Sequence, residues 1–587
     1  MSRLGGCVCL GLACAWQTPA VGETIEDKAT KLVGLKLPGL KTHRVPMRDG
    51  VKLATDVVLP KGQPDAKWPA VLVRTPYNRR GSIGKMAASI LPVTGFAAVV
   101  QDLRGRFDSE GEDYPVHAGC GWGKVQDGYD TIEWIAKQPW CNGKVGTVGP
   151  SAMGATQNLT LPTQPPHLVS AFVIVAWADI YKHAAYWGGA PRLALPEGWI
   201  AGNRFDPRNL DLFLAHPSYD EFWDAWNTEK MAHRIDVPVL YFGGWYDHFC
   251  QGTIDSFLAV QARGGPVAKR TSRLVMGPWT HTGIPKGLDY PDNARPRYDR
   301  YIVKWFNRHL KQADPTAGGK QHPVSYYVMG ASGEKDAPGH EWRSAETWPV
   351  PGKPVPYYLR KGGLLSTDKP TESAASASYQ YDPRNPVPSL GGGVLTPKTG
   401  VLDQRPAEKR PDVIVFTTSV LAEPVEATGR ITVKLWASSS CTDTDFTAKL
   451  TDVYPDGRSL LVLDGIVRAR YRESLRRPKL IEPGKIYPFE IDLWSTSIIF
   501  NKGHRIRVAI SSSNVQRFRP NPNTGDAVDG VTVRPEYRRS LRKAKWMALG
   551  KENPLEIKQA VVATNTIWFD TGHPSHIILP RPTGGPR

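Results

Sequence analysis

The sequence predicts an α/β fold followed by a β-sandwich. Between residues 40 and 283, short apolar runs rich in β-branched residues alternate with helix-like segments, which is typical of a mostly parallel sheet covered by helices. After residue 349, Pro- and Gly-rich turns separate short alternating segments without helical spacers, which favours a jelly-roll sandwich. The 587 residues exceed what one hydrophobic core holds, so two or three domains are expected.

We expect the first domain at residues 40–350 and the second at 351–587, with a linker near 345–355. The segment 177–235 lacks strand alternation and is rich in aromatic residues, so we expect a helical cap over a pocket. Core packing is the more frequent role for any one of these rings, with substrate contact as the alternative. The buried strands of the first sheet are predicted at 69–74, 96–101, 144–148, 171–175, 237–242 and 273–276.

Composition places the chain among ordinary globular proteins. Hydrophobic residues make up 41 % and charged residues 22 %, and no internal apolar run approaches the ~20 residues of a membrane span. The formal charge is +18, but the densest basic stretch, 534–545, carries no nucleic-acid-binding motif. We interpret that stretch as a solvated basic face, and predict a small-molecule partner without nucleic acid or a membrane span.

The first 22 residues resemble a secretory signal. A single Arg3 precedes a short apolar run that ends in Ala13-Cys14-Ala15. This pattern predicts a periplasmic or secreted protein, with a cytoplasmic one as the alternative. The later cysteines lack the CxxC spacing of a metal site, and leave open a disulfide between Cys120 and Cys141 or buried free thiols.

Ser151 is the candidate nucleophile. A predicted strand runs into Gly149, Ser151 occupies the turn, and a helix with small residues follows, which is the context of a nucleophile elbow. The turn is so sharp that a side chain at position 149 would strike the following helix. The spacing is GxSxxG, with Met153 where the commoner GxSxG pattern has its second Gly, so the motif alone is weak.

Asp247 and His281 are the candidate partners of Ser151. Each directly follows one of the last two predicted strands, and the order Ser, Asp, His at successive strand ends is that of α/β-hydrolases. In such a triad, Ser attacks, His removes and returns a proton, and Asp orients the imidazole and stabilises its cation.

An oxyanion hole is also required, because the tetrahedral intermediate concentrates negative charge. By position, the backbone N–H of Ala152 is one donor. For the second donor we select the hydroxyl of Tyr77, which follows an early strand, while a structural Tyr in a Pro-anchored turn is the alternative.

Five motifs occur in the following order along the chain: RTPYN at 74–78, QDLRGR at 101–106 with SEG at 109–111, GPSAMG at 149–154, GWYD at 244–247 and GPWTH at 277–281. As a set they resemble the CocE/NonD hydrolases, a family of X-Pro dipeptidyl-peptidase-like serine hydrolases. The resemblance covers residues 45–580 and implies an α/β-hydrolase domain, a helical cap and a C-terminal jelly-roll. It gives the triad and Tyr77 the roles described above, and it implies that Trp187, Trp199 and Phe249 form an acyl pocket.

Two departures from the family pattern bear on the substrate. Ala152 stands where the family usually has Tyr, which reshapes the space beside the nucleophile. His248, Phe249 and Cys250 follow Asp247, where α-amino-acid ester hydrolases have acidic residues that bind the ammonium group of the substrate. We therefore predict a serine esterase or acylase for small acyl substrates that needs neither cofactor nor metal.

Two other functions remain as alternatives. An X-Pro dipeptidyl-peptidase or α-amino-acid ester hydrolase would use the same chemistry but requires acidic residues that bind a free amine. A non-catalytic carbohydrate-binding protein would act through the jelly-roll. The preference for esters or amides and the oligomeric state are left open, with a homo-oligomer as one alternative.

Overall fold

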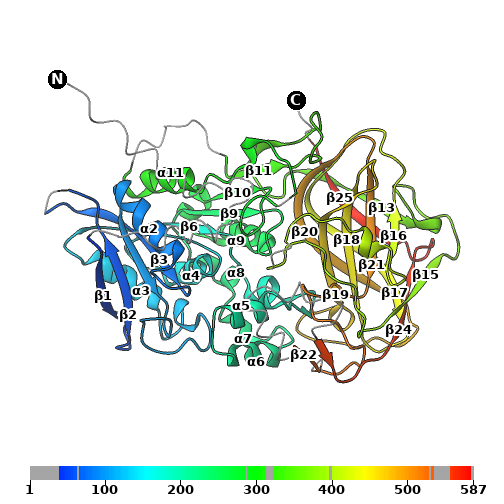
Figure 1. The fold of residues 1–587 in the computed structure, drawn as a ribbon, viewed down its shortest axis with the longest axis horizontal. Helices are drawn as coiled ribbons and strands as arrows, with labels where there is room; N and C mark the ends of the chain where they lie inside the picture. The colour runs from blue at the N-terminus through cyan, green and yellow to red at the C-terminus, as the bar shows by residue number, and fades with distance from the viewer. Residues whose placement is uncertain are drawn as a thin grey trace.

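The computed structural model describes residues 39–62, 65–285, 287–312, 322–395, 399–527, 530–533 and 555–583. The predicted leader at 1–22 and the whole basic stretch at 534–545 lie outside the described residues, so export and the basic face stay predictions. A blue-to-green α/β part and a yellow-to-red β part lie side by side (Figure 1). Within the described ranges, every helix is too short or too polar to cross a membrane.

The first sheet has ten strands, and its centre is parallel. Strands β4, β3, β5, β6, β9, β10 and β11 run parallel, while β1, β2 and β12 are antiparallel at the edges. The six predicted strands coincide with β3, β4, β5, β6, β9 and β10. In spatial order the strands are β1 (Lys41–Pro46), β2 (Lys52–Val58), β4 (Ala97–Asp102), β3 (Trp68–Thr75), β5 (Cys141–Pro150), β6 (Leu168–Ile174), β9 (Val239–Gly244), β10 (Arg273–Gly277), β11 (Val324–Val328) and β12 (Glu341–Ala345).

Helices cover both faces of this sheet. Strand β3 shows why both faces are apolar: Val71 and Val73 join the cluster that contains residues of α2 and α11, while Leu72 joins the cluster with residues of α3 and α9. Alternate residues of a strand point to opposite faces, so a strand buried on both sides must be apolar throughout. The helices are α2 (Ser82–Val93), α3 (Asp127–Ala136), α4 (Ala152–Thr160), α9 (Cys250–Arg263), α10 (Pro266–Thr271) and α11 (Tyr298–Leu310), with short helical turns η2 (Ala118–Cys120), η3 (Leu161–Thr163) and η6 (Asp292–Ala294).

The predicted cap consists of short helices and one small hairpin. Many of its aromatic rings pack on one another: Tyr181 stacks on Tyr186 at 4.7 Å, and Trp223 meets both rings edge-on. These rings therefore form the core of the cap, as expected for most of them. The elements are η4 (Tyr181–Ala185), β7 (Tyr186–Trp187), β8 (Ala190–Pro191), α5 (Pro196–Gly202), α6 (Arg208–Ala215), α7 (Glu221–Asp224), α8 (Thr228–Met231) and η5 (Ala232–Arg234).

The C-terminal part is a β-sandwich of jelly-roll type, as predicted. Its long strands β17 and β20 pair antiparallel, and β20 also approaches the first sheet through a bridge between Met329 and Ile498. The strands are β13 (Gly352–Arg360), β14 (Leu364–Ser366), β15 (Ser376–Tyr381), β16 (Ile414–Thr417), β17 (Val425–Ser439), β18 (Asp445–Val453), β19 (Ser459–Arg468), β20 (Tyr487–Phe500), β21 (Arg505–Ser511), β24 (Ala563–Trp568) and β25 (His576–Pro582). A separate pair is β22 (Val531–Val533) with β23 (Leu555–Ile557), and the short turns are η7 (Lys361–Gly363), α12 (Arg405–Glu408) and η8 (Ala469–Tyr471).

Candidate active site

Ser151 lies in a sharp, strained turn between β5 and α4. Its φ of 61° and ψ of −127° lie outside the regions that a side chain favours, and strain of this kind is concentrated at functional sites. A Cβ at Gly149 would lie 2.5 Å from the Cβ of Met153 in the following helix, and one at Gly154 would lie 2.8 Å from the Cβ of Ala176. The two glycines therefore let the turn close, as expected for Gly149.

The loops after β9 and β10 are joined by backbone hydrogen bonds. The N–H of Trp245 donates to the carbonyl of Gly277 at 2.9 Å, and the N–H of Tyr246 donates to the carbonyl of Trp279 at 3.0 Å. A Cβ at Gly244 would lie 2.2 Å from that same Trp279 carbonyl, so the close approach requires glycine. This pairing brings the segment that carries Asp247 against the segment that carries His281.

Asp247 and His281 form a short hydrogen bond. Nδ1 of His281 lies 2.6 Å from Oδ2 of Asp247, while Oδ1 of Asp247 accepts the backbone N–H of Phe249 at 2.6 Å. The Asp247 side chain is fully buried, and that of His281 is 15 % exposed. Because Nδ1 donates to the carboxylate, the imidazole presents Nε2 as its second nitrogen for proton transfer.

Tyr77 reaches the start of α4, where Ser151 and Ala152 lie. Its hydroxyl makes hydrogen bonds with the Ser151 side chain and the Ala152 backbone, and it accepts the Nε1–H of Trp199 at 2.7 Å. Burial raises the pKa of this phenol, so it stays protonated and can donate near neutral pH. The structure thus places both expected oxyanion donors beside Ser151.

A buried arginine holds the turn that presents Tyr77. Arg106 donates from Nε to the carbonyl of Pro76 at 3.2 Å and from Nη2 to the carbonyl of Asn203 in the cap at 2.6 Å. Asp102, at the end of β4, accepts Arg79 through both its backbone N–H and its guanidinium, each at 2.6 Å. Asp102 and Arg106, two residues of the motif at 101–106, therefore hold the turn that carries Tyr77 and connect it to the cap.

The pocket that contains Ser151 is small and largely apolar, with a volume of about 40 Å³. Two of the three predicted acyl-pocket residues, Trp199 and Phe249, line it. Ser151 and Ala152 form its polar end. The remaining described lining residues are His117, Trp177, Ile180, Ala184, Leu195, Pro196, Phe213 and Leu395.

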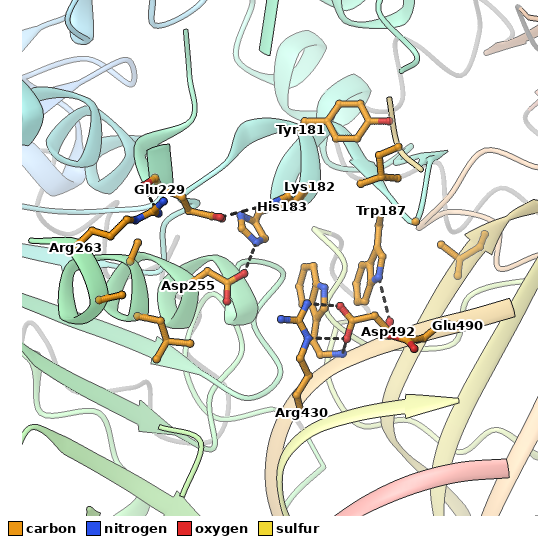
Figure 2. Close-up of a pocket in the computed structure, with 17 residues that line it drawn as sticks. Tyr181, Lys182, His183, Trp187, Glu229, Asp255, Arg263, Arg430, Glu490 and Asp492 are labelled. Carbon is orange, nitrogen blue, oxygen red and sulfur yellow. Dashed lines mark hydrogen bonds and ion pairs between the residues drawn. The ribbon is translucent and has the colours of Figure 1, made fainter. Parts of the chain in front are cut away.

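Trp187 lies elsewhere, and its assignment to the acyl pocket is corrected. It ends β7, and Gly188 and Gly189 turn the chain into β8 with φ values of 54° and 79°. The hairpin directs the indole onto the sandwich, where it stacks on Trp494 with ring centroids 3.7 Å apart and donates to the carbonyl of Asp492. Figure 2 shows it in a separate cavity between the cap and the sandwich.

That separate cavity contains a group of metal-ligand types, His183, Glu229 and Asp255 (Figure 2). Nδ1 of His183 accepts the backbone N–H of Asp179 at 3.2 Å, so the ring proton lies on Nε2 and is directed to Asp255 at 3.1 Å. A metal would need the lone pair of Nε2 and would break this arrangement. We therefore interpret the group as a hydrogen-bonded network.

The other group of metal-ligand types is Asp247, His248 and His281, and it belongs to the site described above. The imidazole of His248 lies beside that of His281, with ring centroids 4.0 Å apart. Burial lowers the pKa of His248 well below the usual range, so this ring stays neutral. The carboxylate of Asp247 is already committed to His281 and Phe249, which explains the cluster without a metal.

Sequence reasoning missed Trp177 and His117 as pocket residues. Trp177 follows β6 by three positions, and the rule that sites gather at the ends of parallel strands could have identified it. His117 lies in a loop between β4 and α3 with no local motif. Of the two alternatives left for the cysteines, the structure shows free, buried thiols at Cys120 and Cys141.

Comparisons with known proteins agree with this architecture. A family model for X-Pro dipeptidyl-peptidase (S15 family) matches residues 49–209 and 203–283, and one for the X-Pro dipeptidyl-peptidase C-terminal non-catalytic domain matches 318–578. Cocaine esterase from Rhodococcus sp. (strain MB1 Bresler) is 35 % identical, with 91 % of this chain and 97 % of that protein covered.

Solved structures extend the likeness to the whole fold. An α-amino acid ester hydrolase labelled with selenomethionine is 26 % identical with a TM-score of 0.73, covering 92 % of this chain and 96 % of its own. An aminopeptidase from the marine sediment archaeon Thaumarchaeota archaeon is 24 % identical with a TM-score of 0.76, covering 92 % and 95 %. The second likeness concerns the fold alone.

Proposed function

We propose, because this chain belongs to the CocE/NonD hydrolases of the X-Pro dipeptidyl-peptidase (S15) family, that Ser151, Asp247 and His281 are its catalytic triad. The chain is a serine hydrolase that acts on ester bonds. The observation that carries the residue assignment is the 2.6 Å bond between His281 and Asp247, at the same sheet edge as the strained Ser151 turn.

The reaction follows from the arrangement of these groups. Oγ of Ser151 attacks the carbonyl carbon of the ester while Nε2 of His281 takes the hydroxyl proton. The carbonyl oxygen becomes an oxyanion, which accepts hydrogen bonds from the N–H of Ala152 and the hydroxyl of Tyr77.

The intermediate then collapses in two stages. The bond between the carbonyl carbon and the alcohol oxygen breaks, and His281 gives its proton to the departing alkoxide, which leaves an acyl-Ser151 ester. Water repeats the attack with His281 as the base, and collapse of the second intermediate returns the proton to Ser151 and releases the carboxylic acid. Asp247 stabilises the imidazolium in both stages.

The pocket favours a short, uncharged acyl group. Its volume of about 40 Å³ is that of a small group, and its described walls are aromatic and aliphatic apart from His117, Ser151 and the backbone. None of the described lining residues is acidic, so the pocket lacks a partner for an α-ammonium group. We infer that small acyl esters are the preferred substrates.

The test uses p-nitrophenyl esters and a fluorophosphonate probe. The parent should hydrolyse p-nitrophenyl acetate and become labelled at Ser151, and Ser151→Ala should lose both properties. Retained turnover in Ser151→Ala would exclude the proposed nucleophile. Thermal melting of the variant shows whether the fold survives the change.

The alternative functions are separated by one further substrate. An X-Pro dipeptidyl-peptidase would cleave Gly-Pro-p-nitroanilide and spare p-nitrophenyl acetate, and an α-amino-acid ester hydrolase would require the α-amine. The pocket walls favour neither of them. The non-catalytic carbohydrate-binding alternative is set aside, because the chain is an ester hydrolase by its relatives.

A further inference from the structure

A second cavity shares a lining residue with the pocket that contains Ser151. It has a volume of about 420 Å³, roughly ten times that of the Ser151 pocket. Of the described residues that line the two cavities, His117 alone belongs to both. His117 therefore forms part of the wall of both the small space and the much larger one.

The ring of His117 is firmly held in that wall. It lies nearly parallel to Trp199, with centroids 5.8 Å apart and an interplanar angle of 16°, and it meets Trp177 edge-on at 5.9 Å. The residue is only 7 % exposed. Its backbone has a φ of 65°, a left-handed conformation that is uncommon for a residue with a side chain.

The imidazole makes little use of its polarity within the protein. Nδ1 is buried without a hydrogen-bond partner. Burial, together with the nearby charge of Arg74, lowers the pKa of His117 to about 4, so the ring is neutral at physiological pH. What the side chain supplies is therefore a flat, neutral ring of fixed position.

The second cavity can accept an apolar chain. Leu103, Val116 and Phe205 line it, and all three are buried in the same hydrophobic cluster as Trp177 and Phe249. Apolar side chains thus continue on both sides of His117.

The buried charges of the second cavity are neutralised. Arg104 pairs with Asp127 and Arg106 with Asp113, each at 2.7 Å. Glu112 and Lys124 also line the cavity, so its lining is mixed. An incoming alkyl chain would contact the apolar part formed by Leu103, Val116 and Phe205.

We propose that His117 is the end wall of the acyl pocket and sets the length of the acyl chain that the enzyme accepts. This inference rests on the proposed function of Ser151. A short acyl group ends against the ring, while a longer chain would have to pass through it to reach the second cavity. Replacing the ring by a smaller side chain joins the two spaces and admits longer acyl groups.

The experiment compares His117→Gly with His117→Phe. Glycine removes the ring and readily adopts the left-handed backbone conformation of this position. Because Nδ1 has no hydrogen-bond partner, removing it leaves no other group unpaired. Phenylalanine keeps a flat ring of somewhat larger size in the wall and removes the nitrogens. His117→Asn, which also tolerates this backbone conformation, serves as a second small variant if the glycine variant fails to fold.

The readout is kcat/KM on p-nitrophenyl esters from acetyl to octanoyl. For His117→Gly we expect the ratio of hexanoyl or octanoyl to acetyl to rise above that of the parent by about fourfold for each methylene that enters the second cavity. His117→Phe should keep the chain-length profile of the parent. An unchanged profile in His117→Gly overturns the proposal, as does an equal shift in His117→Phe.

Failure of this inference is distinguishable from failure of the proposed function. Fluorophosphonate labelling of Ser151 and hydrolysis of p-nitrophenyl acetate are measured on every variant. If the parent does neither, the assignment of Ser151 is wrong. If both are present and only the chain-length profile stays constant, the role of His117 alone is wrong.

Discussion

Tyr77→Phe separates transition-state stabilisation from packing in a single substitution. The change removes one oxygen and keeps the ring. That oxygen makes hydrogen bonds with Ser151, Ala152 and Trp199, so its loss removes one of the two proposed oxyanion donors. Loss of such a donor typically lowers kcat by about 10²- to 10³-fold, which corresponds to about 2.7–4 kcal/mol.

A second quantity changes in the same variant. The indole N–H of Trp199 loses its acceptor at 2.7 Å, and an unpaired buried donor costs about 1–3 kcal/mol of stability. We therefore expect a lower thermal midpoint together with the loss of kcat. KM for p-nitrophenyl acetate should change little, because the walls of the acyl pocket are intact.

Trp199→Phe is the matched control. It removes the same hydrogen bond from the other side and leaves the Tyr77 hydroxyl free to donate to the oxyanion. Because Trp199 also lines the acyl pocket, KM will change in this variant, and kcat is the quantity to compare. Its thermal midpoint should fall comparably, while its kcat should fall by less than about tenfold, the loss expected for one neutral hydrogen bond. A lost oxyanion donor should lower kcat by far more than about fivefold. If kcat of Tyr77→Phe stays within about fivefold of the parent, Tyr77 is not an oxyanion donor. Equal kcat losses in the two variants would refute that role as well.

Three further predictions concern the triad, the elbow and pH. Asp247→Asn leaves Nδ1 of His281 without its carboxylate and should lower kcat on p-nitrophenyl acetate by about 10⁴-fold near neutral pH; a loss below about tenfold would contradict the triad. Gly149→Ala places a methyl 2.5 Å from Met153 and should destabilise the fold by about 1–3 kcal/mol in thermal or urea unfolding, whereas Gly198→Ala, in open space within α5, should be neutral or stabilising. Burial lowers the pKa of His117 to about 4, so between about pH 6.5 and 4 the unfolded chain binds a proton at this residue and the folded chain does not. The free energy of unfolding should therefore fall by about 3 kcal/mol as the pH is lowered through that range, and His117→Phe should remove this part of the pH dependence.

The parts of the molecule that the sequence predicts well are those fixed by local physics. A strand buried on both faces must be apolar throughout, so β3 and β9 are visible in the sequence as short apolar runs. A nucleophile elbow needs Gly149 for a steric reason that acts within four residues, namely the clash of a side chain there with Met153. The role of Gly149 is therefore predictable from the local sequence. The order of Ser151, Asp247 and His281 follows from the parallel sheet, because every strand delivers its following loop to the same edge.

The parts that the sequence does not predict depend on contacts between distant segments. The family resemblance implies a place in the acyl pocket for Trp187, but the direction of this side chain is set by a two-residue hairpin and by Trp494 of the sandwich. His117 has its role through rings about 60 and 80 residues further along the chain, Trp177 and Trp199. Composition and periodicity carry no information on such pairs.

The sandwich is part of the active site rather than an appendage to it. Leu395 supplies one wall of the Ser151 pocket, and a Cβ at Gly393 would lie only 3.1 Å from the carbonyl oxygen of Asp247. The C-terminal part therefore packs directly on the loop that carries the proposed triad carboxylate.

A buried arginine extends this support to the cap. Arg192 donates from Nη1 to the carbonyls of His183 and of His248, the residue next to Asp247. The backbone of Arg192 also forms a β-bridge with Phe518 of the sandwich, so cap, sandwich and catalytic loop meet at one residue. Because a triad tolerates little misplacement, the position of Asp247 depends on all three parts, and the sheet alone is not sufficient to define it.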